Sequence, residues 1–246
     1  MSVNVRIVLV NTTHPGNIGG VARAMKNMKF EELHLVAPKK FPHPNADARA
    51  SGATDLLENA VVHETLEAAI ADCQLVVGTS ARGRHIPWPV VDPRELASII
   101  YPIMTDKKVA IVFGREDRGL TNEELHLCHH HVHIPSNEAF SSLNLAAAVQ
   151  VITYELRMAS LYASQNEAHK PQWGTEWDMD LAESADLERL FEHMEQTLID
   201  IEFLDPERPR QLMPRLRRLY LRSLMDKVEV NVLRGILTAT QKHVKK

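Results

Sequence analysis

A repeated order of short apolar runs, polar loops and helical segments constrains the fold of this chain more than any other feature. The runs at residues 5–10, 33–36, 75–81 and 109–113 are rich in β-branched side chains, which predicts buried strands. Strands that alternate with helices form parallel sheets, because each helix returns the chain to the same starting edge. The sequence therefore predicts an α/β fold, with a parallel sheet and helices on both faces.

Segments rich in Gly, Ser and Asn follow these strands. Residues 11–20 contain three glycines, a proline and two asparagines, which predicts a loop whose backbone can approach a ligand closely. The segments with helical character are residues 21–28, 46–50, 66–70, 93–97 and 122–125, the last with Thr121 as its cap. Ligands of parallel α/β sheets bind beyond the carboxyl ends of the strands, so the polar segments are expected to gather at one ligand-binding edge.

The segment from residue 132 to residue 151 gives the most detailed local prediction. A short strand at residues 132–134 is followed by a turn and then by the helix formers of residues 145–150. Ser141, Ser142 or Asn144 is therefore predicted at the helix N-terminus, where backbone N–H groups can hold an anionic or polar ligand. When the segment is taken alone, an ordinary capped helix that closes a loop is the simpler explanation.

The chain changes character after about residue 160. Residues 165–180 are polar and indicate a linker, whereas residues 181–204 and 212–237 carry apolar side chains at helical spacing, the second stretch as two helices. Residues 206–246 hold eleven Lys and Arg against three acids, a net charge of +8, so the other 205 residues carry −12. This asymmetry indicates a polyanion-binding end, and the alternative is a helix with a basic outer face.

The composition restricts the class of protein. Apolar residues make up 44% of the chain, and no apolar run approaches the roughly 20 residues of a membrane span. No signal peptide is recognisable, and two cysteines, Cys73 and Cys128, fit a reducing compartment better than a disulfide framework, so we expect a cytoplasmic protein with no membrane partner. His129, His131 and His133 share one face of an extended strand but span too far to converge on one zinc ion, so no metal site is predicted.

Three segments stand in a recognisable order: NxGxxARAMKN at residues 17–27, FGREDRGL at residues 113–120 and SSLNLAAAVQ at residues 141–150. This set resembles the three signature motifs of the SPOUT class of RNA methyltransferases, in its 2′-O-ribose branch, over roughly residues 3–160. Within that branch, the likeness is to bacterial enzymes that methylate nucleotide 32 in the tRNA anticodon loop.

The resemblance implies a fold and partners that the sequence pattern alone does not give. It implies a deep trefoil knot in the C-terminal part of the α/β domain, S-adenosylmethionine (SAM) as methyl donor with S-adenosylhomocysteine as product, and a homodimer whose site is completed across the interface. The expected organisation is a methyltransferase domain at residues 1–160, a linker at 161–180 and a small all-α, basic, tRNA-binding extension at 181–246.

The resemblance also implies site residues. The cofactor would be held by three loops, formed by Thr79, Ser80 and Ala81, by Gly114, and by Ile134, Ser141, Ser142 and Leu143. The catalytic positions would be Asn17, Arg23, Glu116, Ser142 and Asn144. For residues 79–81, a plain strand end is the alternative.

Arg23 is the central position that the resemblance implies, beside Asn17, which would orient the substrate. Because a guanidinium stays protonated, Arg23 is expected to anchor the phosphate next to the target ribose or to stabilise the developing alkoxide, rather than to act as a literal base. Deprotonation with help from that phosphate stays open, and a salt bridge on the helix surface is the structural alternative.

Arginines are the candidate tRNA contacts. Arg82, Arg84 and Arg115 lie in loops near the predicted edge, where binding of phosphates and plain solvation are both reasonable. Three further arginines, Arg215, Arg218 and Arg222, are three and four residues apart and so fall near one helical face.

The sequence therefore predicts methyl transfer from SAM to the ribose 2′-OH of cytidine or uridine at tRNA position 32. Two alternatives remain: ribosomal RNA as the substrate of the same fold, and an RNA-binding module without catalysis. A nucleotide-binding oxidoreductase is excluded because the chain lacks GxGxxG and a suitably placed ribose-binding acid.

Overall fold

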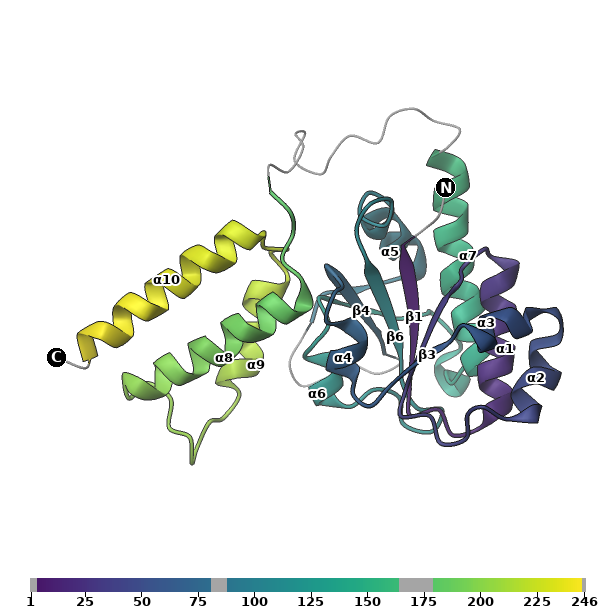
Figure 1. Cartoon of the computed structure of the whole chain (residues 1–246), viewed down its shortest axis with the longest axis horizontal. Coiled ribbons are helices and arrows are strands. Elements are labelled where there is room, and N and C mark those ends of the chain that lie inside the picture. The colour runs from purple at the N-terminus through teal and green to yellow at the C-terminus, as the bar shows by residue number, and fades with distance from the viewer. Residues whose placement is uncertain (1–3, 81–87, 164–178, 245–246) are drawn as a thin grey trace.

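The centre of the molecule is a parallel sheet (Figure 1). The structure is a computed structural model that describes residues 4–80, 88–163 and 179–244. In these residues the sheet has seven strands in the order β3-β2-β1-β6-β4-β7-β5. The strands are β1 (Val5–Val10), β2 (Glu32–Val36), β3 (Val61–His63), β4 (Leu75–Thr79), β5 (Val90–Val91), β6 (Val109–Phe113) and β7 (His130–Val132). Every pairing in it is parallel, which confirms the predicted sheet.

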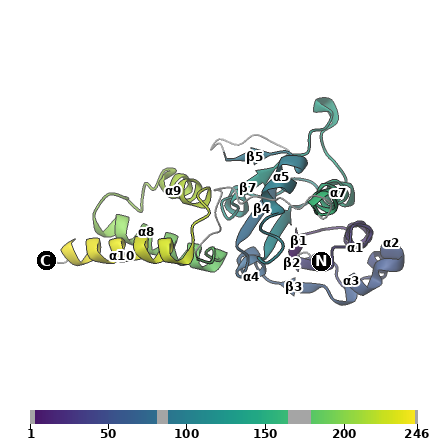
Figure 2. The ribbon, with the colours of Figure 1, turned by 90° about the horizontal axis from the view of Figure 1, so that it is seen from above.

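Helices cover both faces of the sheet (Figure 2). The helices beside the sheet are α1 (Pro15–Asn27), α2 (Pro44–Ala50), α3 (Thr54–Glu58), α4 (Leu66–Ile70), α5 (Pro93–Ile100), α6 (Asn122–Leu125) and α7 (Leu145–Ala163). Strand β1 sends Ile7 and Leu9 into a core shared with α1, α5 and α7, whereas Val8 and Val10 enter a second core with α4 and α6. Alternation along a strand produces this division, since successive side chains point to opposite faces.

Helix α1 begins at Pro15, so the predicted loop at residues 11–20 is wrong for its second half. His14 caps the helix, because its Nδ1 accepts a hydrogen bond from the Gly16 N–H at 3.1 Å. Gly19 packs against α2 so closely that a Cβ there would lie 2.0 Å from the carbonyl oxygen of Ala46. This glycine therefore permits close contact between two helices, not the approach of a ligand.

Strand β7 also departs from its prediction. It spans His130–Val132, two residues earlier than the expected 132–134. The neighbouring strands explain the shift, because β4 pairs with residues 130–132 and β5 with residues 131–132. Strand β4 likewise ends at Thr79, not at residue 81, so the polar residues after both strands belong to loops.

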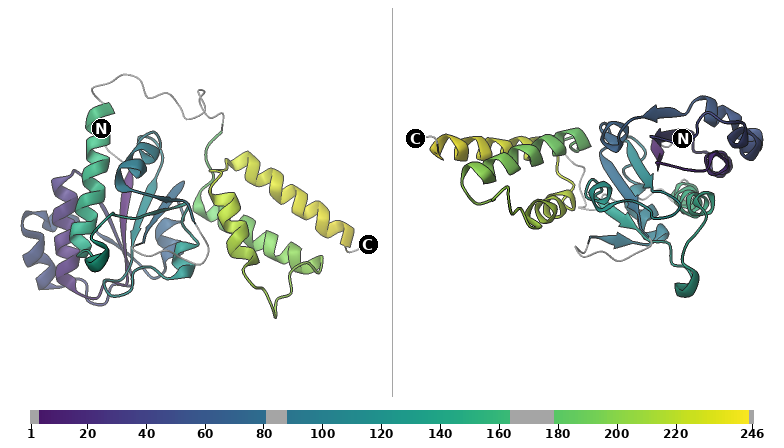
Figure 3. Two further views of the ribbon diagram at one scale, coloured as in Figure 1. Left: turned by 180° about the vertical axis from the view of Figure 1, so that it is seen from behind. Right: turned by 90° about the horizontal axis from the view of Figure 1, so that it is seen from below.

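The C-terminal part of the chain is helical, as predicted, and consists of α8 (Ser184–Asp200), α9 (Leu212–Leu221) and α10 (Lys227–Val244) (Figure 3). Trp88 connects these helices to the sheet, because it packs with Leu187, Phe191 and Leu221 in a third core. Its indole stacks on His131 and donates a hydrogen bond of 2.9 Å to the Cys128 carbonyl. Within the described residues, no helix is both long and apolar enough to cross a membrane.

Candidate functional site

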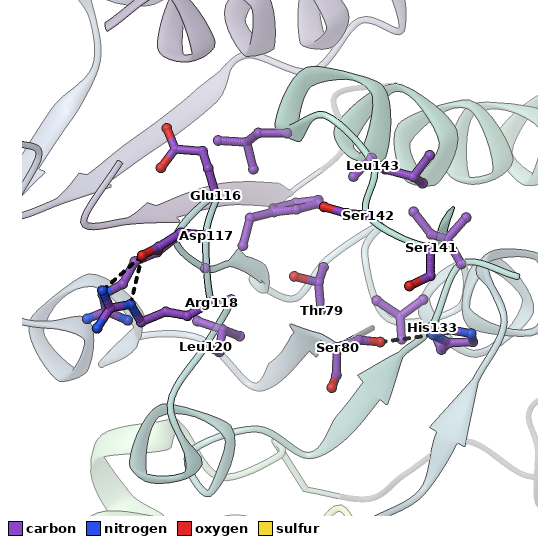
Figure 4. A pocket seen from close by; sticks show the side chains of 18 residues that line it. Thr79, Ser80, Glu116, Asp117, Arg118, Leu120, His133, Ser141, Ser142 and Leu143 are labelled. Atoms are coloured by element: carbon purple, nitrogen blue, oxygen red, sulfur yellow. Dashed lines mark hydrogen bonds and ion pairs between the residues drawn. The ribbon is translucent and has the colours of Figure 1, made fainter. Parts of the chain in front are cut away.

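A pocket lies at the carboxyl edge of the sheet, beyond the ends of β4, β6 and β7 (Figure 4). Seven of the eight predicted cofactor positions line it: Thr79, Ser80, Gly114, Ile134, Ser141, Ser142 and Leu143. The eighth, Ala81, lies outside the described residues. The structure thus brings together three loops that are far apart in the sequence, because parallel strands end at the same edge.

One wall of the pocket is a tight turn at residues 115–119, called here the rim turn. It closes through two backbone hydrogen bonds between Arg115 and Gly119, of 3.2 and 2.8 Å. Gly114 is required beside it, because a Cβ at that position would lie 2.1 Å from the Gly119 carbonyl carbon. Arg115 then ties the turn to α6 through two contacts of 3.0 Å with the carboxylate of Glu124. The turn is therefore held at both its backbone and its side chains.

Glu116 projects from the rim turn toward the start of α1. Its carboxylate accepts hydrogen bonds from the backbone N–H groups of Thr13 and His14 at 3.2 Å, and from Nδ2 of Asn17 at 2.8 Å. Burial acts to raise the pKa of Glu116, but these hydrogen bonds favour the ionised form and hold the pKa below its usual value. Such a carboxylate is a weak proton acceptor, so its geometry suits an anchor more than a general base.

Asn17 extends this contact to the third motif. Its Oδ1 accepts a hydrogen bond of 3.3 Å from Nδ2 of Asn144. Oδ1 of Asn144 in turn accepts from the Ala146 N–H at 3.0 Å and so caps α7, which confirms that this asparagine stands at the helix start. Three of the five predicted catalytic residues, Asn17, Glu116 and Asn144, are therefore linked in one series of hydrogen bonds.

The other two predicted catalytic residues lie differently. Ser142 lines the pocket, at the side that faces the rim turn in Figure 4. Arg23 is exposed on α1, six residues beyond Asn17, which places it about 120° around the helix axis from that side chain. Among the described residues, Arg23 makes no hydrogen bond or ion pair, and it does not line the pocket. Within a single chain, Arg23 is therefore not brought together with the predicted cofactor residues.

The predicted RNA-contacting arginines also separate into groups. Arg82 and Arg84 lie outside the described residues. On α9, Arg215 is exposed and Arg218 is half-buried, and Arg222, which directly follows the helix, is exposed. Their neighbour Arg217 has a structural role, because it pairs with both oxygens of Glu188 at 2.6 and 2.7 Å.

Sequence patterns did not single out several residues of the site. Thr13 and His14 bind Glu116 through their backbone, so their side-chain types carry little signal. His133, considered above only as a metal ligand, lines the pocket and places its Nδ1 3.1 Å from the Ser80 carbonyl oxygen. Within the described residues, no group of three or more His, Cys, Asp or Glu is arranged to hold a metal ion.

Both parts of the chain match models of known protein families. The model of the SpoU rRNA Methylase family matches residues 4–154, and that of the tRNA methyltransferase TrmJ C-terminal domain matches residues 185–246. The tRNA (cytidine/uridine/adenosine-2'-O-)-methyltransferase TrmJ of Pseudomonas aeruginosa is 59% identical over 242 residues, covering 97% of this chain and 94% of the relative.

Two further relatives agree. The tRNA (cytidine/uridine-2'-O-)-methyltransferase TrmJ of Cronobacter sakazakii is 51% identical, covering 98% of this chain and 97% of the relative. The crystal structure of TrmJ from Z. mobilis superposes with a TM-score of 0.81 at 33% identity, covering 95% of this chain and 97% of the other.

Proposed function

The chain belongs to the SpoU methylase family, which confirms the resemblance in its three motifs, and from this premise we propose that it is a SAM-dependent tRNA 2′-O-methyltransferase. Its substrate is the ribose 2′-OH of cytidine or uridine at position 32 of the anticodon loop. The observation that carries the proposal is that the second and third motifs line one pocket and are hydrogen-bonded to Asn17 of the first motif, in a chain that matches named tRNA 2′-O-methyltransferases over nearly its whole length.

The pocket fits a cofactor of this kind. Leu120, Val132 and Leu145 supply apolar surface, while Thr79 and the serines 141 and 142 supply hydroxyl groups. Gly114 shapes one wall, because the missing Cβ lets the backbone of Gly119 and Leu120 pack directly against it. Bound SAM supplies an electrophilic methyl group, and the protein needs only to hold it, align the ribose hydroxyl and assist loss of the proton.

The linked residues position the reactants. Glu116 stays ionised and fixes Asn17, whose amide lies between the rim turn and the start of α7. We infer that Arg23 reaches the site from the partner subunit of a homodimer, since it is exposed and turned away from the pocket of its own chain. There its guanidinium would anchor the phosphate beside the target ribose or stabilise the developing alkoxide.

We also propose the domain organisation. Residues 1–160 form the methyltransferase domain with a trefoil knot in its C-terminal part, residues 161–180 a linker, and residues 181–246 an all-α tRNA-binding extension in a cytoplasmic enzyme. Support for the knot comes from β7, which enters the sheet between β4 and β5 although it follows both in sequence, and from α7, which returns to pack on α1 and α5. Helix α7 ends at Ala163, three residues beyond the proposed boundary.

Tritium transfer from labelled SAM to bulk tRNA tests the proposal, with nuclease mapping of the modified nucleotide. We expect a 2′-O-methyl mark at nucleotide 32 that Arg23→Ala abolishes and that Lys29→Ala, on the exposed turn after α1, leaves intact. Transfer to ribosomal RNA alone would replace the substrate. SAM binding without transfer to any RNA would favour the RNA-binding module without catalysis.

A further inference from the structure

A second arginine of the rim turn, Arg118, lies at the mouth of the pocket. It lines the pocket, yet 71% of its side chain is exposed. Its Nε and Nη2 donate to one carboxylate oxygen of the adjacent Asp117, at 3.0 and 2.9 Å, and 59% of the Asp117 side chain is exposed. Figure 4 shows this pair beside the pocket, on the side away from Ser141.

Arg115, the rim-turn arginine selected from sequence, has the opposite environment. Its side chain is 20% exposed and meets Glu124, which is 15% exposed, through two nitrogen–oxygen pairs. An enclosed, two-pronged pair is costly to break, because it would leave an uncompensated charge away from water. An exposed pair between neighbouring residues contributes little to stability, so another anion can displace it. The two arginines are thus suited to different tasks.

We propose that Arg118 binds a backbone phosphate of the RNA at the mouth of the pocket, and that Asp117 occupies its guanidinium until the RNA arrives. This inference rests on the proposed function and adds to it a substrate contact. The planar guanidinium suits a phosphate because it presents paired N–H donors to two oxygens. Since the turn is fixed by Gly114, Gly119 and the Arg115–Glu124 pair, the bound phosphate would stand at a constant place relative to the pocket.

Asp117 gives the proposal a second consequence. Its carboxylate competes with phosphate for the same guanidinium and also repels the RNA backbone. Asp117→Asn removes both effects while keeping the size of the side chain. Removal of Asp117's charge should therefore strengthen RNA binding, whereas removal of Arg118's charge should weaken it.

The test measures the Kd for unmodified tRNA at several salt concentrations, the KM for tRNA in methyl transfer, and the Kd for SAM by calorimetry. The variants are Arg118→Gln, Asp117→Asn and the control Lys29→Gln, which removes an exposed positive charge between α1 and β2, at the sheet edge opposite the pocket. For Arg118→Gln we expect a tRNA Kd and KM raised about three- to tenfold and a salt slope reduced by about 0.7–0.9, as for one lost phosphate contact. Asp117→Asn should lower the tRNA Kd about twofold or more, and neither variant should shift the SAM Kd beyond about twofold.

Three outcomes would overturn the inference. One is a tRNA Kd for Arg118→Gln equal to that of Lys29→Gln. Another is a weakened SAM Kd with unchanged tRNA binding, which would make Arg118 a cofactor ligand. The third is an absence of tRNA binding by the wild type. If the wild type methylates tRNA and the Arg118→Gln variant has the same tRNA Kd and KM as the wild type, this contact is rejected and the proposed function stands.

Discussion

Replacement of Asn144 can separate two hydrogen bonds that one side chain makes at the start of α7. Its Oδ1 caps the helix by accepting from the Ala146 N–H, and its Nδ2 donates to Asn17. Asn144→Ala removes both bonds. Asn144→Asp keeps an oxygen for the cap but has no donor for Asn17, and it adds a negative charge near the ionised Glu116.

The expected magnitudes differ for stability and for activity. Loss of an N-cap to alanine costs about 1 kcal/mol, whereas aspartate caps as well as asparagine does. In a chain of this size, about 1 kcal/mol lowers Tm by about 2–4 °C. Both variants also remove the donor to Asn17 Oδ1. Because that bond is exposed, water can replace it at little cost in Tm, but Asn17 is no longer held in place, so both variants should lose about tenfold or more in kcat/KM.

Calorimetric Tm values and methyl transfer to tRNA measure the two effects on the same preparations. We expect Asn144→Asp to melt within about 1 °C of wild type and yet to lose activity, while Asn144→Ala loses both. Wild-type activity in Asn144→Asp would show that the bond to Asn17 does not position the site. An equal loss of Tm in the two variants would show that Asn144 does not act as the helix cap.

Three further predictions concern the glycines at the rim turn, His34 and Trp88. Gly114→Ala places a Cβ 2.1 Å from the Gly119 carbonyl carbon and should abolish SAM binding in calorimetry. The control Gly119→Ala meets nothing within 4 Å, so it should cost about 1–2 kcal/mol of stability for its φ of +73° and still bind SAM. Equal loss of SAM binding in the two variants would contradict this account. Burial and the nearby Arg6 lower the pKa of His34 from 6.5 to about 4, so the unfolded chain binds the extra proton and the free energy of unfolding should fall as pH falls from 6.5 to 4. His34→Phe should flatten that slope in urea titrations, and an unchanged slope would exclude His34 as its source. Trp88→Ala should lower the free energy of unfolding in urea by about 3–5 kcal/mol, because it leaves a cavity in the core that Trp88 shares with the C-terminal helices. A loss below about 1 kcal/mol would show that this core contributes little to the packing of those helices.

The sequence predicts best those elements whose pattern is set by their own burial. Residues 5–10, 66–70 and 109–113 coincide with β1, α4 and β6, since each has an apolar run bounded by polar or turn-forming residues. The strands β3 and β5 were not predicted. They have only three and two residues, respectively, and contain exposed valines, so they show no apolar periodicity. They are strands only because a neighbouring strand offers them hydrogen bonds.

The site shows the same division. Parallel strands followed by polar segments, together with the family resemblance, predict that Thr79, Gly114 and Ser142 share an edge, and the structure places all three on one pocket. Sequence does not reveal that Glu124 holds Arg115 while Arg118 lies open at the rim, because both arginines follow the same strand. The start of α1 was equally hidden, since a glycine that permits close packing of two helices looks the same in sequence as one that admits a ligand.

The series of hydrogen bonds between Glu116, Asn17 and Asn144 has a consequence for synthesis of the chain. Its partners are separated by 99 and 127 residues, so the loops that must close are long and the contacts are slow to form. A nascent chain cannot complete them until residue 144 and the first turn of α7 have left the ribosome. Because Ser141, Ser142 and Leu143 of the same stretch line the pocket, the pocket is also completed late, after all seven strands described above have been made rather than after the first half of the sheet.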